Sequence, residues 1–117
     1  MSFIKKRIKS FLVALEGWSV LWSEDHSKIH LLATIAVLCT GWYFQIEPIE
    51  WGLICMSIAM VWVAEGMNTA IEHLTDIASP ETHPKAKMTK DVSAGAVLIA
   101  AIFAVIIGGI VFIPYLV

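Results

Sequence analysis

The chain has 117 residues, of which 58% are hydrophobic and only 15% carry a charge. Soluble globular domains contain about a quarter charged residues, so this composition favours an integral membrane protein, and the length allows a single domain, 1–117. The formal net charge is −2, and no basic cluster is interleaved with aromatic residues. We therefore expect no nucleic-acid partner.

The N-terminal segment, about 3–22, is predicted to be an amphipathic helix that lies on a membrane surface. Its cations Lys5, Lys6, Arg7 and Lys9 alternate with apolar residues at steps of three and four, which is the helical period. Cations on one side with Phe and Trp on the other are typical of an interfacial helix. An ordinary amphipathic helix that packs on a soluble core is the alternative.

Three long apolar runs follow, and each is predicted to be a transmembrane helix: about 29–46, 49–75 and 90–117. The first run would span about 27 Å at ~1.5 Å per residue, close to the hydrocarbon thickness of a bilayer. All eight Lys and Arg residues lie in the N-terminal segment, at Lys28 or between the second and third runs. Three spans with a cytoplasmic N-terminus place every cation on the cytoplasmic side.

The second run ends in an acidic stripe within the segment AEGMNTAIEHLTD. Glu65, Asn68, Glu72 and Asp76 are separated by three, four and four residues, so they share one helix face within about 80°. Carboxylates at membrane depth are unfavourable unless they face a bundle interior, and they usually have a function. The stripe could be polar contacts between helices, a set of ion or proton ligands in a transporter, or a catalytic site for a bilayer substrate.

Two further groups favour the catalytic interpretation. Glu24 precedes the first run, and Lys90 and Asp91 precede the third, so the predicted topology brings them to the membrane level of Glu72. Carboxylates can hold Mg²⁺ together with substrate phosphates, a lysine can neutralise phosphate oxygens, and another carboxylate can accept a hydroxyl proton. This set suits phosphoryl transfer, although the chain has no Walker-type loop and no protein-kinase signature.

Three segments resemble one known family. EGMNTAIEHLTD fits E-x-x-N-[ST]-A-x-E-x-x-x-D, KDVSAGAVLIAA follows it, and SEDHSKIH precedes the first span. This order and spacing is similar to that of the small prokaryotic diacylglycerol kinases and undecaprenol kinases, over nearly the whole chain from about residue 10. The resemblance implies an all-α homotrimer in the bacterial cytoplasmic (inner) membrane. Each subunit would have a surface helix and three transmembrane helices, and the active sites would be shared between subunits.

The resemblance also implies roles for particular residues in an ATP- and Mg²⁺-dependent lipid kinase. Glu65 would be the general base for the lipid hydroxyl, and Asn68 would support the catalytic site. Glu24 and Glu72 would bind Mg²⁺. The residues implied to contact the nucleotide, directly or through the metal, are Glu24, Glu72, Asp76, Glu81, Thr82, His83, Lys90 and Asp91.

The chain departs from well-known members near Leu12 and Val13, where some members have a nucleotide-contacting tyrosine. The segments HPKAKMTKD and KIH look more like the undecaprenol-kinase branch, so diacylglycerol and undecaprenol both stay open as substrates. His30 and His73 are interpreted as polar surface or helix-start contacts. A small ion-coupled transporter and a non-catalytic membrane subunit are the alternative functions.

Overall fold

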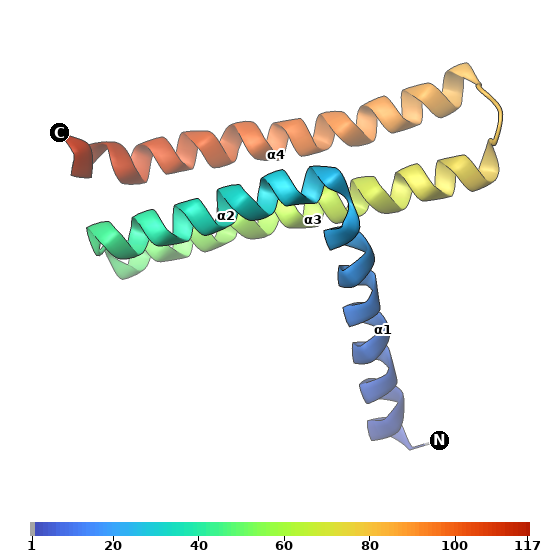
Figure 1. Ribbon diagram of the computed structural model, residues 1–117, viewed down its shortest axis with the longest axis horizontal. Helices are drawn as coiled ribbons and strands as arrows, with labels where there is room; N and C mark the ends of the chain where they lie inside the picture. Colours follow the sequence, from blue (N-terminus) through green and yellow to red (C-terminus); the bar gives the residue numbers. More distant parts are fainter. Residues whose placement is uncertain (1) are drawn as a thin grey trace.

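A computed structural model describes residues 2–117, and within this range every regular element is an α-helix. Figure 1 shows one helix running steeply away from three others that lie lengthwise beside one another. The elements are α1 (Phe3–Ser23), α2 (Asp25–Phe44), α3 (Pro48–Ala78) and α4 (Pro84–Leu116). The last three are long and apolar enough to cross a membrane. The predicted all-α membrane fold, with an N-terminal helix and three spans, is confirmed.

The direction of the chain changes at Glu24, between α1 and α2. Glu24 has an extended backbone (φ −71°, ψ 141°), and it is both the C-cap of α1 and the N-cap of α2. Helix α1 begins after Ser2, whose side chain accepts a hydrogen bond from the backbone of Lys5, and it contains no buried residue. Helix α1 therefore leaves the bundle with both of its faces exposed, and Glu24 lies at the corner.

Helices α2 and α3 form a tight antiparallel pair at the end of the bundle remote from Glu24. Gln45 ends α2 in the left-handed conformation (φ 51°), and Pro48 occupies the first turn of α3, where no backbone donor is needed. The side chains of Glu47 and Glu50 form a capping box. The hydroxyl of Tyr115, near the end of α4, donates to Glu50, which joins α4 to α3 at this end.

Gly41 leaves room for the Trp51 ring where α2 approaches α3. A Cβ atom at this position would lie 2.8 Å from the Trp51 ring and 3.2 Å from the Ile46 side chain. A Cβ at Gly52 would meet no atom within 4 Å, so Gly52→Ala is a matched control in which only helix propensity changes.

We expect the free energy of unfolding of Gly41→Ala to lie about 1–3 kcal/mol below that of Gly52→Ala, because the added methyl group overpacks the contact with Trp51. Unfolding in mixed micelles, followed by circular dichroism, measures the difference. Equal stabilities of the two variants would show that the two helices do not approach each other this closely.

The helices extend beyond the apolar runs that predicted them. Helix α2 begins at Asp25 rather than near 29, and α4 begins at Pro84 rather than near 90. Pro84 is at the first helical position, and the ring Nδ1 of His83 accepts a hydrogen bond from the Lys85 backbone at 3.1 Å. Hydropathy indicates where lipid contact begins, whereas caps indicate where a helix begins. Most of the segment between the predicted second and third spans, 76–89, is therefore helical.

Burial in the single chain is the reverse of that in a soluble protein. The only buried large apolar side chains among residues 2–117 are Ile46, Ile54 and Val111, whereas the buried polar set is larger: Ser27, Ser57, Glu65, Asn68, Thr69, Thr75 and Ser93. Most large apolar side chains of α2, α3 and α4 are exposed. Such a surface suits lipid or neighbouring subunits, and the polar interior gathers toward the end where α2 begins and α3 leads into α4. We call this the polar end.

Candidate active site

Glu65 is the most buried acid of the polar end. It lies on the face of α3 that meets α2, and its side chain is only 4% exposed. Its Oε2 atom lies 3.1 Å from Nε2 of His30, one and a half turns into α2. A buried carboxylate is unfavourable without a polar partner, so this contact makes the position of Glu65 tenable. The residue predicted as general base is therefore held by a histidine from another helix.

Asn68 links α3 to α4, one turn along from Glu65. The hydroxyl of buried Ser93 donates to Oδ1 of Asn68 at 2.5 Å, and Nδ2 of Asn68 donates to Oε1 of Glu72 at 3.1 Å. The carboxylate fixes the orientation of the amide, because only the amide nitrogen can donate to it, and the amide oxygen then accepts from the Ser93 hydroxyl. Asn68 thereby sets the position of the Glu72 carboxylate.

Glu24 and Glu72 were predicted to bind Mg²⁺, and the structure brings the Glu24 side chain to the residue that follows Glu72. Oε1 of Glu24 lies 3.4 Å from Nε2 of His73, the residue directly after Glu72. Within residues 2–117 no group of three or more His, Cys, Asp or Glu side chains is assembled as a metal site. Mg²⁺ is usually held by one or two carboxylates and by substrate phosphates, so Glu24 and Glu72 are ligands of the type that this ion takes, and their joint binding of it stays a prediction.

A polar cavity of about 300 Å³ lies where α3 leads into α4. Two ion pairs border it: Lys90 Nζ with Asp76 Oδ1 at 2.5 Å, and Lys87 Nζ with Asp91 Oδ2 at 2.6 Å. The hydrogen bond and the charge of Asp91 raise the pKa of Lys87, which precedes the apolar part of α4. Six residues predicted to contact the nucleotide line this one cavity: Asp76, Glu81, Thr82, His83, Lys90 and Asp91.

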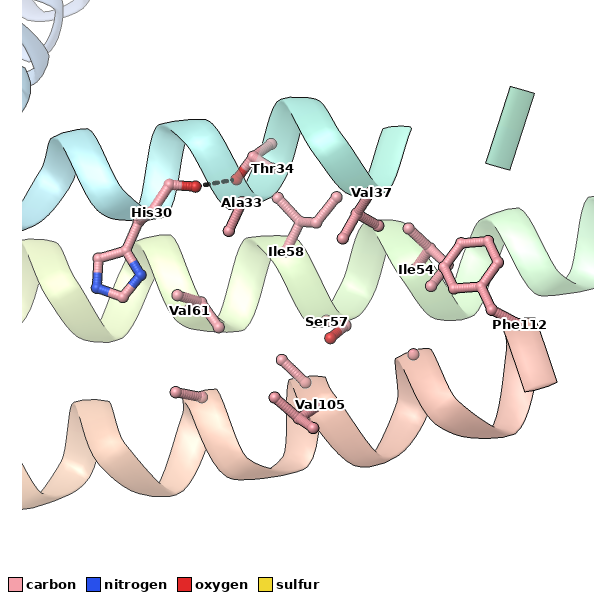
Figure 2. A pocket seen from close by; sticks show the side chains of 13 residues that line it. His30, Ala33, Thr34, Val37, Ile54, Ser57, Ile58, Val61, Val105 and Phe112 are labelled. Atoms are coloured by element: carbon pink, nitrogen blue, oxygen red, sulfur yellow. Dashed lines mark hydrogen bonds between the residues drawn. The ribbon is translucent and has the colours of Figure 1, made fainter. Parts of the chain in front are cut away.

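A second cavity, of about 260 Å³, is apolar and lies among α2, α3 and α4 (Figure 2). Aliphatic side chains such as Val37, Ile58 and Val61 form most of its wall, and His30 lines it as well. The Thr34 hydroxyl donates to the His30 carbonyl at 2.7 Å, a bond drawn in Figure 2, and accepts from Trp62 Nε1 at 3.0 Å. His30 therefore lines the apolar cavity and also contacts the buried carboxylate of Glu65.

Two contacts of the site were not predicted. His30 was interpreted as a helix-start contact, and Ser93 was not considered. Ser93 lies one turn after Lys90, so its helix face could have been inferred from the sequence. The pairing of His30 with Glu65 depends on which faces of α2 and α3 meet, and no local sequence pattern shows that.

The fold and the site define an integral membrane protein with an acidic, hydrogen-bonded centre between a polar and an apolar cavity. The family model for prokaryotic diacylglycerol kinase matches residues 12–112, and the chain belongs to this family. It is 38% identical to the undecaprenol kinase of Bacillus subtilis over 114 residues, which is 97% of this chain and 93% of that protein.

Two diacylglycerol kinases are also similar. The Helicobacter pylori (strain 26695) protein is 31% identical over 90% of this chain and 83% of its own length. The Escherichia coli (strain K12) protein is 32% identical over 85% of this chain and 82% of its own length. The expected family is confirmed, and with it the enzyme class, lipid kinase.

Proposed function

We propose that the protein transfers the γ-phosphoryl group of ATP to the hydroxyl of a membrane lipid in an Mg²⁺-dependent reaction. The observation that carries this proposal is the position of Glu65. Its carboxylate lies 3.1 Å from the ring of His30, which lines the apolar cavity, and its own helix, α3, continues to the polar cavity that Lys90 borders. A lipid and a nucleotide can therefore approach one centre from two environments.

The reaction requires Glu65 to accept the proton of the lipid hydroxyl. The hydroxyl oxygen then forms a bond to the γ-phosphorus of ATP, the bond from that phosphorus to the β–γ bridging oxygen breaks, and ADP leaves. Lys90 neutralises phosphate oxygens, and Asn68 keeps Glu72 in place. Mg²⁺, when held by Glu24 and Glu72, supplies further neutralisation of phosphate charge. Positioning and charge neutralisation provide most of the rate enhancement.

The nucleotide is assigned to the polar cavity. The polar cavity is lined by the Lys87 and Lys90 ammonium groups, the Thr82 hydroxyl and the His83 ring. The cavity is open at the end of the bundle. Asp76 lies one turn beyond Glu72 on α3, so phosphates beside Lys90 would extend along α3 toward Glu72. Phosphates that bind the Lys90 ammonium would compete with the Asp76 carboxylate, which lies 2.5 Å from it.

A polyprenol such as undecaprenol is the favoured lipid, ahead of diacylglycerol. The 38% identity is to a protein named undecaprenol kinase, and it covers nearly the whole of both chains. The wall of the apolar cavity is almost entirely hydrocarbon, and its Thr34 hydroxyl already donates one bond and accepts another. The ester carbonyls of diacylglycerol would find few free donors there, whereas an isoprenoid chain needs none.

The working form is proposed to be a homotrimer in the bacterial inner membrane, with the N-terminus and the polar end in the cytoplasm. The distribution of cations supports this orientation, since it places them all on the cytoplasmic side. Few apolar side chains of the single chain are buried, and within residues 2–117 the side chain of Glu24 has one polar contact, with His73 on α3. Neighbouring subunits would cover the exposed helix faces and complete the sites that subunits share.

Purified protein in lipid–detergent micelles with labelled ATP, Mg²⁺ and a panel of undecaprenol and diacylglycerol tests the function directly. We expect labelled phospholipid, with undecaprenol the better acceptor, and no label in a reaction that lacks divalent cation. A protein that phosphorylates neither lipid would contradict the proposal. Preference for diacylglycerol would overturn only the choice of substrate.

A further inference from the structure

His30 occupies an unusual position for a histidine in an apolar helix. Its Nε2 atom lies 3.1 Å from Oε2 of Glu65, its ring lines the apolar cavity, and its side chain is 21% exposed. Figure 2 shows the ring pointing from α2 toward α3, beside Val61. His30 thus reaches Glu65 from the side on which a lipid chain would lie.

Two contacts hold His30 in this position. Trp62 Nε1 donates to Thr34 Oγ1, which in turn donates to the carbonyl oxygen of His30. The rings of His30 and Trp62 are also in an edge contact, with centroids 6.2 Å apart and planes inclined by 66°. The backbone and the ring of His30 are therefore fixed by the same pair of residues, one on α2 and one on α3.

The contact with His30 makes the two oxygens of Glu65 inequivalent. Oε2 lies 3.1 Å from His30 Nε2, whereas no hydrogen bond or ion pair within residues 2–117 involves Oε1. A carboxylate held by one oxygen has a fixed plane, so the direction of the free oxygen is also fixed.

We propose that His30 is a positioning residue for phosphoryl transfer, which donates a hydrogen bond from Nε2 to Oε2 of Glu65 and so aims Oε1 at the lipid hydroxyl. This inference rests on the proposed role of Glu65 as the general base. His30 does not exchange a proton with the substrate in this scheme, so a neutral side chain with a suitable N–H can replace it.

Three variants test this role in the full-length protein: His30→Leu, His30→Gln and the control His26→Gln. His26 is exposed at the start of α2. We expect His30→Leu to lower kcat for lipid phosphorylation by ~100-fold, because misplacement of a catalytic group by about 1 Å has an effect of this size. The KM for ATP should be unchanged, His30→Gln should recover a large part of kcat, and His26→Gln should match the wild type.

The outcomes separate this inference from the proposed function. An inactive wild-type protein would contradict the lipid-kinase function itself. An active wild type with an unimpaired His30→Leu variant would overturn the role of His30 alone. Equal losses in His30→Leu and His30→Gln would also overturn it, because they would require the histidine itself to carry the proton.

A spectroscopic measurement avoids dependence on the folding of His30→Leu. In ¹⁵N-histidine-labelled protein, the His30 signals are assigned by their absence in His30→Gln. We expect a proton on Nε2 whose resonance moves when Glu65→Gln replaces the charged acceptor by a neutral one, because charge-assisted hydrogen bonds are shorter and stronger. The proposal would be overturned if Nε2 of His30 carried no proton, or if the resonance of that proton were the same in the wild type and in Glu65→Gln.

Discussion

Replacement of Glu65 by glutamine is expected to lower the rate of lipid phosphorylation by ~10³-fold, within the range for loss of a general base. The amide has almost the same shape as the carboxyl group, and its oxygen can still accept a hydrogen bond from His30, so the helix contact is kept. Its nitrogen cannot accept the lipid proton. A radiolabel assay with saturating lipid and ATP measures the rate.

The stability of this variant should be equal to or greater than that of the wild type, because a buried carboxyl group is replaced by a neutral one. Glu16→Gln is the matched control, since Glu16 is exposed on α1 and should tolerate the same change without effect. A Glu65→Gln enzyme with wild-type turnover would remove Glu65 from the mechanism. The transporter alternative predicts instead a loss of solute flux, without consumption of ATP.

Replacement of Lys90 by glutamine should lower kcat/KM for ATP by about 10- to 100-fold. This range follows from the typical strength of a hydrogen bond that involves a charged group. Lys90 borders the polar cavity, and its ammonium group is bound to Asp76 at 2.5 Å. The lipid dependence of the rate should change little, because the apolar cavity lies elsewhere in the bundle. Initial rates over a range of ATP concentrations measure the effect.

Lys85→Gln is the matched control for this prediction. Lys85 is an exposed lysine near the start of α4, the helix that also carries Lys90. It neither lines the polar cavity nor appears in an ion pair within the described chain. We expect its kcat/KM for ATP to equal that of the wild type. Equal losses in both variants would indicate a general effect of positive charge at this end rather than a specific contact of Lys90 with phosphate.

Features whose residues all lie within one helix could be predicted from the sequence. The acidic stripe on α3 could be predicted because Glu65, Asn68 and Glu72 follow the helical period, and the structure places Asn68 and Glu72 in one hydrogen-bonded pair. The three spans could be predicted because lipid selects long apolar runs. Roles within the site, such as metal binding by Glu24, stay predictions.

Contacts between helices could not be predicted in the same way. Helix α2 is apolar on nearly every side, so nothing in its sequence indicates which face meets α3. The link from Trp62 through Thr34 to His30 depends on that face, and so does the contact of His30 with Glu65. The pairing of Lys90 with Asp76 likewise depends on how tightly the chain turns between α3 and α4.

The reversed burial of this chain has a consequence for its evolution. In a water-soluble protein the apolar core restricts which residues are accepted, and the polar surface drifts. Here most large apolar side chains of the spans face outward, and where they meet lipid rather than a neighbouring subunit, one hydrocarbon group can replace another with little change in contact energy. The small polar interior of Asn68, Ser93 and their partners has no such freedom, because each member needs a hydrogen-bonding partner of matching shape. Neutral substitutions should therefore accumulate on the apolar, lipid-facing surface. Distant relatives should still share the few buried polar residues.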